Sequence, residues 1–241
     1  MQRQPLIQKI VLKYLAKDKY ALTVIKIYFG VTVVLAISEL FGLKAVVFLF
    51  KPLLIPLLAL LYILQSEKRS YYYIAALLFA WSSNIFLLST TRDYLLYGII
   101  AFMLYRLLSI IVVVKLMTKF LFVPFIIAAL PFIFIFSCLI NITVNIEARE
   151  FFPTVINGIL ISVLAGIALS NYILNDNKKN SWLAISTLLF IALVSIFLFE
   201  KYYISNVMFQ PISALIFGFA HYTFYRFVIE SEKPDLKSDI Y

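Results

Sequence analysis

Long apolar runs, each about as long as a bilayer is thick, occupy most of this chain. A membrane-spanning helix needs about 20 mostly apolar residues. Connections of ten residues or fewer separate the runs, so consecutive helices are expected to be antiparallel neighbours. The sequence therefore predicts an all-α fold, a polytopic membrane bundle of eight transmembrane helices, at residues 20–38, 45–65, 70–89, 94–114, 120–141, 152–173, 181–199 and 203–229.

The composition excludes a water-soluble globule. Of the 241 residues, 63% are hydrophobic and 14% charged, whereas soluble domains carry roughly 25% charged residues. Residues 20–229 are expected to form one transmembrane domain, and residues 230–241 a cytoplasmic tail. Residues 1–19 alternate apolar and basic side chains at helical spacing, which is typical of an amphipathic helix on the inner membrane surface. A solvated lead-in is the alternative.

The basic residues predict the orientation of the bundle. With the N-terminus in the cytoplasm, the inner segments hold fourteen Lys and Arg residues, counting Arg226 at the inner end of the last span, and the outer segments hold four. This is the asymmetry that the positive-inside rule requires, so both termini are expected to be cytoplasmic. The net charge of +9 is then explained by anionic lipid headgroups and requires no nucleic-acid partner.

Several classes of site are excluded by residue counts. The single cysteine, Cys138, excludes a disulfide within the chain and a cysteine metal site, and the single histidine, His221, excludes a site that needs two histidines. No metal-ligand set and no nucleotide-binding loop occurs, so we expect neither metal nor cofactor. The expected partner is membrane lipid, and the sequence does not indicate an oligomeric state or a protein partner.

One twelve-residue phrase occurs twice. Residues 77–88 are LLFAWSSNIFLL and residues 188–199 are LLFIALVSIFLF, so six of twelve positions agree and Asn84 falls opposite Ser195. The spans that follow share a Tyr-Arg pair, at 105–106 and 225–226. These echoes indicate a 4+4 parallel internal repeat, an arrangement known from transporters. Chance similarity in an oily chain is the alternative.

Polar side chains inside the spans are the candidate functional residues, because a charge in hydrocarbon is costly. Lys51 lies inside the second span and Arg106 near the middle of the fourth. The outer half of the bundle also collects Asn84, Ser195, Glu200, Asn206 and Gln210. Asn and Ser in spans often only join helices, at about 0.6 kcal/mol per hydrogen bond. Packing is therefore the alternative for Asn84 and Ser195.

The segments FKPLLIPLLALL (50–61), LLFAWSSNIFLL (77–88) and YGIIAFMLYRLL (97–108) resemble the YhhN family, the lysoplasmalogenases. This resemblance implies a bacterial cytoplasmic-membrane protein with eight spans. It implies hydrolysis of the vinyl ether bond of lysoplasmalogen to a fatty aldehyde and a glycerophospho-headgroup. It assigns Lys51 to a family lysine, Arg106 to a family histidine and Asn84 to a first aspartate. A second family aspartate falls on Ser195 or its neighbour Val194.

The replaced acids leave three functions open. Vinyl ether hydrolysis needs a proton donor, and a carboxylic acid provides one where Asn and Ser do not; Glu200, about one turn above Ser195, is the substitute. A lysoplasmalogenase-type enzyme would use Asn84, Ser195 or Glu200 as catalytic positions, with Lys51, Arg106, Asn206 and Gln210 binding the lipid. A non-catalytic lipid-binding or partner-binding subunit would have a basic, acid-free pocket. A small-solute transporter would have a water path to both faces.

Overall fold

The computed structural model describes residues 3–89, 91–117, 120–142 and 146–233, with side chains from Asp18 onward. The described residues form helices and no strand, which confirms the predicted all-α bundle. The elements in chain order are α1 (Arg3–Leu40), α2 (Lys44–Phe50), η1 (Lys51–Leu53, a short 3-10 helix), α3 (Leu54–Gln65), α4 (Tyr71–Phe86), α5 (Arg92–Leu116), α6 (Phe122–Ile142), α7 (Ala148–Leu174), α8 (Lys178–Tyr202) and α9 (Phe209–Glu232).

Seven segments of the described chain are long and apolar enough to cross a membrane. Six match predicted spans closely, and α1 contributes Asp18–Leu40. The remaining predicted span is α4, whose 16 residues make a helix of about 24 Å at 1.5 Å per residue. It is shorter than the other spans, yet it packs along α5 in an extensive antiparallel pair.

The second span is interrupted rather than continuous. Between Lys44 and Gln65 the chain passes from α2 through η1 into α3, and the interruption lies at Pro52 and Pro56. Proline has no backbone N–H, so each removes a helical hydrogen bond. Pro211 has no such effect, because it lies in the first turn of α9, where the backbone N–H groups have no helical partner.

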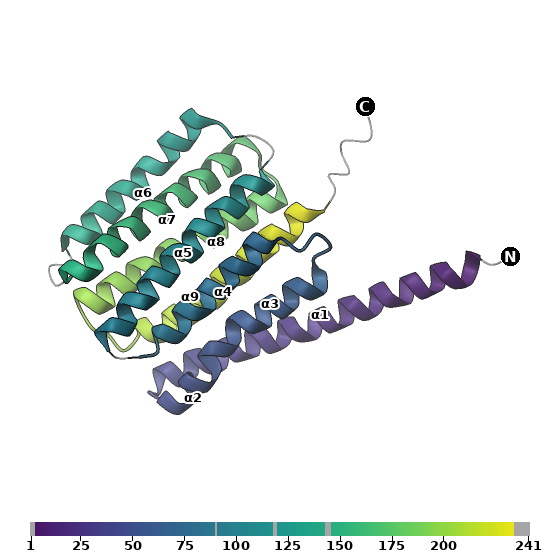
Figure 1. Cartoon of the computed structure of the whole chain (residues 1–241), viewed down its shortest axis with the longest axis horizontal. Helices are drawn as coiled ribbons and strands as arrows, with labels where there is room; N and C mark the ends of the chain where they lie inside the picture. Colours follow the sequence, from purple (N-terminus) through teal and green to yellow (C-terminus); the bar gives the residue numbers. More distant parts are fainter. Residues whose placement is uncertain (1–2, 90, 118–119, 143–145, 234–241) are drawn as a thin grey trace.

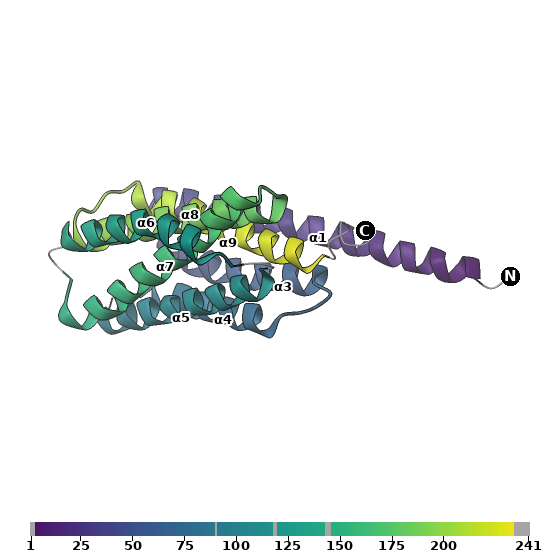
Figure 2. The same cartoon turned by 90° about the horizontal axis from the view of Figure 1, so that it is seen from above.

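Seven of the helices form a closed ring. Going round it, α1 contacts α9, then α8, α7, α5, α4 and α3 follow, and α3 contacts α1. Helix α6 packs outside the ring against α7 (Figure 1). Seen from above, α4 and α5 lie in one layer and α8 and α9 in the other, with α7 crossing between them (Figure 2). The ring leaves room for a cavity between the layers.

The two hairpins that carry the repeated phrases are the most extensive helix pairs of the bundle. Helix α4 pairs with α5, and α8 pairs with α9; the two pairs face each other across the layers (Figure 2). This pairing agrees with the 4+4 repeat. The contacts of α1 with α9 have no counterpart of similar size between α5 and α6, so the agreement is strongest in the hairpins themselves.

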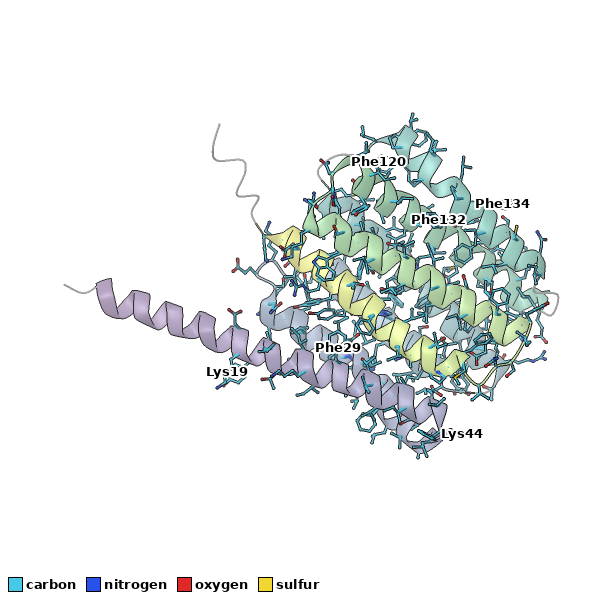
Figure 3. All side chains as sticks on the ribbon, turned by 180° about the vertical axis from the view of Figure 1, so that it is seen from behind. Lys19, Phe29, Lys44, Phe120, Phe132 and Phe134 are labelled. Carbon is cyan, nitrogen blue, oxygen red and sulfur yellow. The ribbon has the colours of Figure 1, made fainter. Side chains whose placement is uncertain are left out.

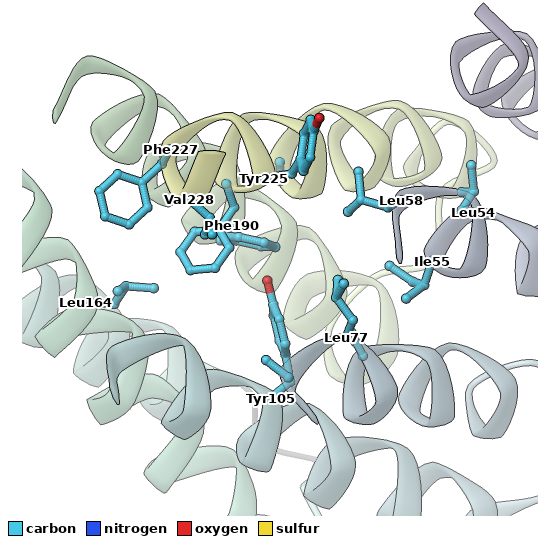
Figure 4. Packing of buried hydrophobic residues seen from close by; sticks show 14 of the residues in the cluster. Leu54, Ile55, Leu58, Leu77, Tyr105, Leu164, Phe190, Tyr225, Phe227 and Val228 are labelled. Atoms are coloured by element: carbon cyan, nitrogen blue, oxygen red, sulfur yellow. The ribbon is translucent and has the colours of Figure 1, made fainter. Parts of the chain in front are cut away.

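The middle of the bundle is filled by aromatic side chains. Tyr105 on α5 and Phe190 on α8 approach within 5.8 Å between ring centroids (Figure 4). Tyr225 on α9 is also fully buried. Large apolar side chains also lie exposed on the outside of the bundle. Phe134 of α6, for example, is 70% exposed (Figure 3). An apolar outer face suits contact with lipid tails.

The first residues of the described chain continue α1. The helix runs unbroken from Arg3 to Leu40, and its N-terminal part extends beyond the bundle in line with the membrane-crossing part (Figure 1). The predicted lead-in at residues 1–19 is therefore helical over its described residues. Its placement on the membrane surface stays a prediction.

Candidate functional site

A cavity of about 470 Å³ lies inside the helix ring, in the half of the bundle that the charge pattern assigns to the outside. This volume is within the range of small-molecule sites. Its wall is built from α1, η1, α4, α5, α7, α8 and α9. Most of the wall is apolar, and the polar side chains on it are Glu39, Lys51, Ser83, Ser89, Asn84, Thr154, Asn157, Glu200, Lys201, Ser205, Gln210 and Ser213. We call it the outer cavity.

Lys51 meets a carboxylate in the wall of the outer cavity. Its Nζ lies 3.5 Å from Oε1 of Glu39, and both side chains are mostly buried. Glu39 sits in the last turn of α1 and Lys51 opens η1, so the pair joins two neighbouring helices at the interrupted second span. A charged side chain inside the membrane needs a partner of opposite charge, and Glu39 and Lys51 provide this for each other. Glu39 was not among the candidate site residues named from the sequence.

Asn84 lies beside this pair on α4. Its side chain is buried, and its Nδ2 donates a 2.8 Å hydrogen bond to the backbone carbonyl of Lys51. The preceding residue, Ser83, donates from Oγ to the carbonyl of Gly98 on α5 at 2.8 Å. A Cβ at Gly98 would approach Leu87 to 2.7 Å, so glycine allows the close contact of α4 and α5. Ser83 and Asn84 of the repeated phrase therefore join α4 to neighbouring elements.

Glu200 closes the outer cavity from the opposite layer. It lies in the last turn of α8, and Nε2 of Gln210, in the first turn of α9, donates a hydrogen bond to its Oε1. Both residues line the cavity, as does Lys201. The structure thus brings together four of the seven predicted site residues: Lys51, Asn84, Glu200 and Gln210.

Ser195 and Asn206 have local partners instead of lining the outer cavity. Ser195 Oγ donates to the carbonyl of Ile191 in its own helix at 2.9 Å. Its neighbour Val194 takes the place on the cavity wall. Asn206 is exposed, and its Oδ1 accepts a hydrogen bond from the backbone N–H of Met208 at 2.9 Å, in the turn before α9. The repeat therefore does not extend to the environments of Asn84 and Ser195.

Arg106 lies beneath the outer cavity rather than in its wall. Its side chain is completely buried, and its guanidinium carbon is 4.9 Å from the ring centre of Phe102 and 4.5 Å from that of Phe190. Phe102 lines the cavity, one turn above Arg106 on α5. The three guanidinium nitrogens have no hydrogen-bond partner among the described residues. Lys51 and Arg106 therefore do not share one pocket wall.

His221 lies in the same buried layer as Arg106. Its ring stacks on Tyr105, with centroids 5.3 Å apart, and its Nδ1 is 3.0 Å from the carbonyl of Phe217. A carbonyl only accepts, so Nδ1 carries the proton and Nε2 is an acceptor. Phe217 itself lines the outer cavity. Phe102 and Phe217 thus separate the cavity from the polar groups below it.

Sequence reasoning missed the contribution of α7. Thr154 and Asn157 line the outer cavity, and the buried Oδ1 of Asn157 has no hydrogen-bond partner among the described residues. The two are three residues apart and so share one face of the helix. Neither residue was named as a candidate from the sequence, because polar side chains of this kind in spans often only join helices.

These features define an integral membrane protein with a mostly apolar cavity that carries carboxylates and an ammonium group in the outer half of an α-helical bundle. The model of the YhhN family matches residues 46–229. The chain belongs to the YhhN family, as its motifs indicated. The matched segment includes every residue of the outer cavity except Leu35 and Glu39, which α1 supplies. No curated protein and no solved structure matches the chain.

Proposed function

We propose that the outer cavity binds a single-chain phospholipid and that the protein hydrolyses its vinyl ether bond, as a lysoplasmalogenase does. The observation that carries this proposal is the pair of carboxylates, Glu39 and Glu200, in a largely apolar cavity that also holds Lys51. A purely basic pocket was the expectation for a non-catalytic relative. The proposal includes residence in the cytoplasmic membrane of a bacterium.

Glu200 is the proposed acid. Glu39 is engaged with Lys51, whereas Glu200 has a neutral amide partner, Gln210. In the proposed reaction the Glu200 carboxylic acid transfers its proton to the β-carbon of the vinyl ether, leaving a cation on the carbon bonded to oxygen. Water adds to that carbon and releases a proton, which restores the acid. The resulting hemiacetal breaks its bond to the glycerol oxygen, giving a fatty aldehyde and the free glycerol hydroxyl.

The remaining groups fit the ends of such a lipid. Lys51 is the proposed partner of the phosphate, since an ammonium is a common phosphate ligand. The unpartnered Oδ1 of Asn157 is an acceptor available to a glycerol hydroxyl. The apolar wall, which includes Leu95, Ile99 and Leu198, suits a hydrocarbon chain.

The experiment is a fatty-aldehyde assay on the purified full chain with lysoplasmalogen. We expect Glu200→Gln to lower the rate about 100-fold or more, the usual contribution of a general acid. Glu150→Gln is the matched control: Glu150 is a buried carboxylate of the same bundle end that accepts a 2.7 Å hydrogen bond from Tyr202 and does not line the outer cavity. Equal rates for the two variants would exclude Glu200 as the acid.

A second candidate function is non-catalytic binding of the same lipid, alone or as the membrane subunit of a partner. It is favoured by the absence of an acid at the positions of the family aspartates, because the resemblance assigns one aspartate to Asn84 and a second to Ser195 or Val194, of which Val194 lines the outer cavity. In that case the wild-type chain binds the lipid and releases no aldehyde. Small-solute transport is not proposed, because Phe102 and Phe217 bound the cavity on the cytoplasmic side.

A further inference from the structure

The interrupted second span leaves the backbone carbonyl of Pro52 without its α-helical partner inside the membrane. Pro56, four residues later, has no N–H with which to reach it. The 3-10 turn Lys51–Leu53 lies at the same place. An unpaired carbonyl in hydrocarbon is strongly unfavourable, so a donor for the Pro52 carbonyl must come from another element.

Helix α4 supplies donors to two successive carbonyls of this turn. Trp81 Nε1 donates to the carbonyl of Pro52 at 2.9 Å, and Asn84 Nδ2 donates to the carbonyl of Lys51 at 2.8 Å. Residues 81 and 84 are one turn apart and lie on the same face of the helix. Both hydrogen bonds therefore hold one short backbone segment against one helix face.

This geometry sets a chemical requirement at position 84. A backbone carbonyl only accepts hydrogen bonds, so the side chain facing it must donate. An asparagine amide donates at every pH, a leucine never donates, and an aspartate donates only while its carboxyl carries a proton. Asparagine at position 84 therefore keeps this hydrogen bond without a titratable proton.

We propose that Asn84 is a positioning residue for Lys51. The residue whose carbonyl Asn84 holds is the one whose ammonium group pairs with Glu39 in the cavity wall. Fixing the Lys51 backbone restricts the positions that the ammonium group can reach on its flexible stem, and with them the binding of an anionic headgroup. The proposal rests on the proposed function for its consequence in binding, but the positioning itself does not depend on any ligand.

The first test therefore measures Lys51 without lipid. The purified full chain is treated with a small amine-acylating reagent, and mass spectrometry compares modification of Lys51 with that of Lys44, an exposed lysine one short helix away. We expect Asn84→Leu to raise Lys51 modification severalfold relative to Lys44. Ser82→Ala is the control, since Ser82 Oγ donates to Leu78 in its own helix and is expected to change nothing. Unchanged Lys51 modification in a folded Asn84→Leu protein overturns the proposal.

A second test separates donation from packing. Trp182→Phe leaves Trp81 as the only tryptophan, so its emission reports on the held turn. In this background we expect Asn84→Asp to match the parent protein at low pH and to shift its emission as the carboxyl ionises. The parent, titrated in parallel, corrects for the other ionisable groups on the cavity wall, Glu39, Lys51, Glu200 and Lys201. A pH-independent emission identical to that of the parent contradicts the donor requirement.

The lipid arm links positioning to binding. With a fluorescent lysophosphatidylcholine as the probe, we expect Asn84→Leu to bind about tenfold more weakly, because the released Lys51 segment must then be ordered when the lipid binds. If the wild-type protein does not bind the probe, the proposed function is wrong, but the effect of Asn84→Leu on Lys51 modification is unaffected. If Asn84→Leu alters Lys51 modification but binds the probe as tightly as the wild type, then the position of Lys51 does not control lipid binding.

Discussion

At the scale of single residues, Arg106 is the least explained group in the bundle. It is fully buried, and no carboxylate pairs with it among the described residues. Three aromatic rings lie within 5.6 Å of its guanidinium carbon. Each such contact is worth about 0.5–2 kcal/mol, so three contribute at most about 6 kcal/mol. The buried guanidinium has five N–H donors without a partner among the described residues, each at a cost of about 1–3 kcal/mol or more, in addition to the penalty of several kcal/mol for an unpaired buried ion. Desolvation should therefore exceed the aromatic attraction.

We accordingly expect Arg106→Met to raise the free energy of unfolding by about 1–3 kcal/mol, because an apolar chain of similar length removes the buried charge. The measurement is a thermal unfolding curve in detergent. Arg226→Met is the matched control: the guanidinium carbon of Arg226 lies 5.4 Å from the ring centre of Trp182, near the end of the bundle that the charge pattern assigns to the cytoplasm, where the charge is only partly buried. A larger loss of stability for Arg106→Met than for the control would show that Arg106 has a strong hydrogen-bond acceptor in the membrane.

The lengths of the helices were predictable because hydrophobic thickness sets them, but their rotation was not. Helices that are apolar on all sides give no signal for the face that turns inward. For this reason depth along a helix correctly grouped Lys51, Asn84 and Glu200 in the outer half. It could not tell that Val194 lines the cavity while Ser195 bonds to its own helix.

At the scale of elements, the interrupted second span depends on α4. Trp81→Phe keeps an aromatic ring but removes the N–H that reaches the carbonyl of Pro52, so we expect a loss of about 1–3 kcal/mol in the free energy of unfolding. Pro56→Ala restores a backbone N–H four residues after Pro52, which can satisfy the same carbonyl. In that background we expect the cost of Trp81→Phe to fall by at least half.

The measurement is a double-mutant cycle of unfolding free energies in mixed micelles, which isolates the coupling between the two sites. Tyr72→Phe, a change at an aromatic residue near the other end of the same helix, serves as the control in both backgrounds. An equal cost of Trp81→Phe with and without Pro56 would mean that the indole contributes packing alone.

At the scale of the whole molecule, the outer cavity opens on one side of the membrane, and the charge pattern says which side. Ser205 lines the cavity and lies in the exposed segment between α8 and α9, and Asp176 lies in the exposed connection between α7 and α8, at the opposite end. The basic excess assigns the Asp176 side to the cytoplasm.

We therefore expect Ser205→Cys, in a Cys138→Ala background that removes the native thiol, to react with a membrane-impermeant maleimide in intact cells. Asp176→Cys should react only after the cells are opened. The expectation follows from the lysine and arginine distribution, which gives orientation without any contact in the fold. The reverse pattern would place the cavity on the cytoplasmic side, where a lipid substrate would have to come from the inner leaflet, and reaction of both cysteines in intact cells would mean a mixed orientation.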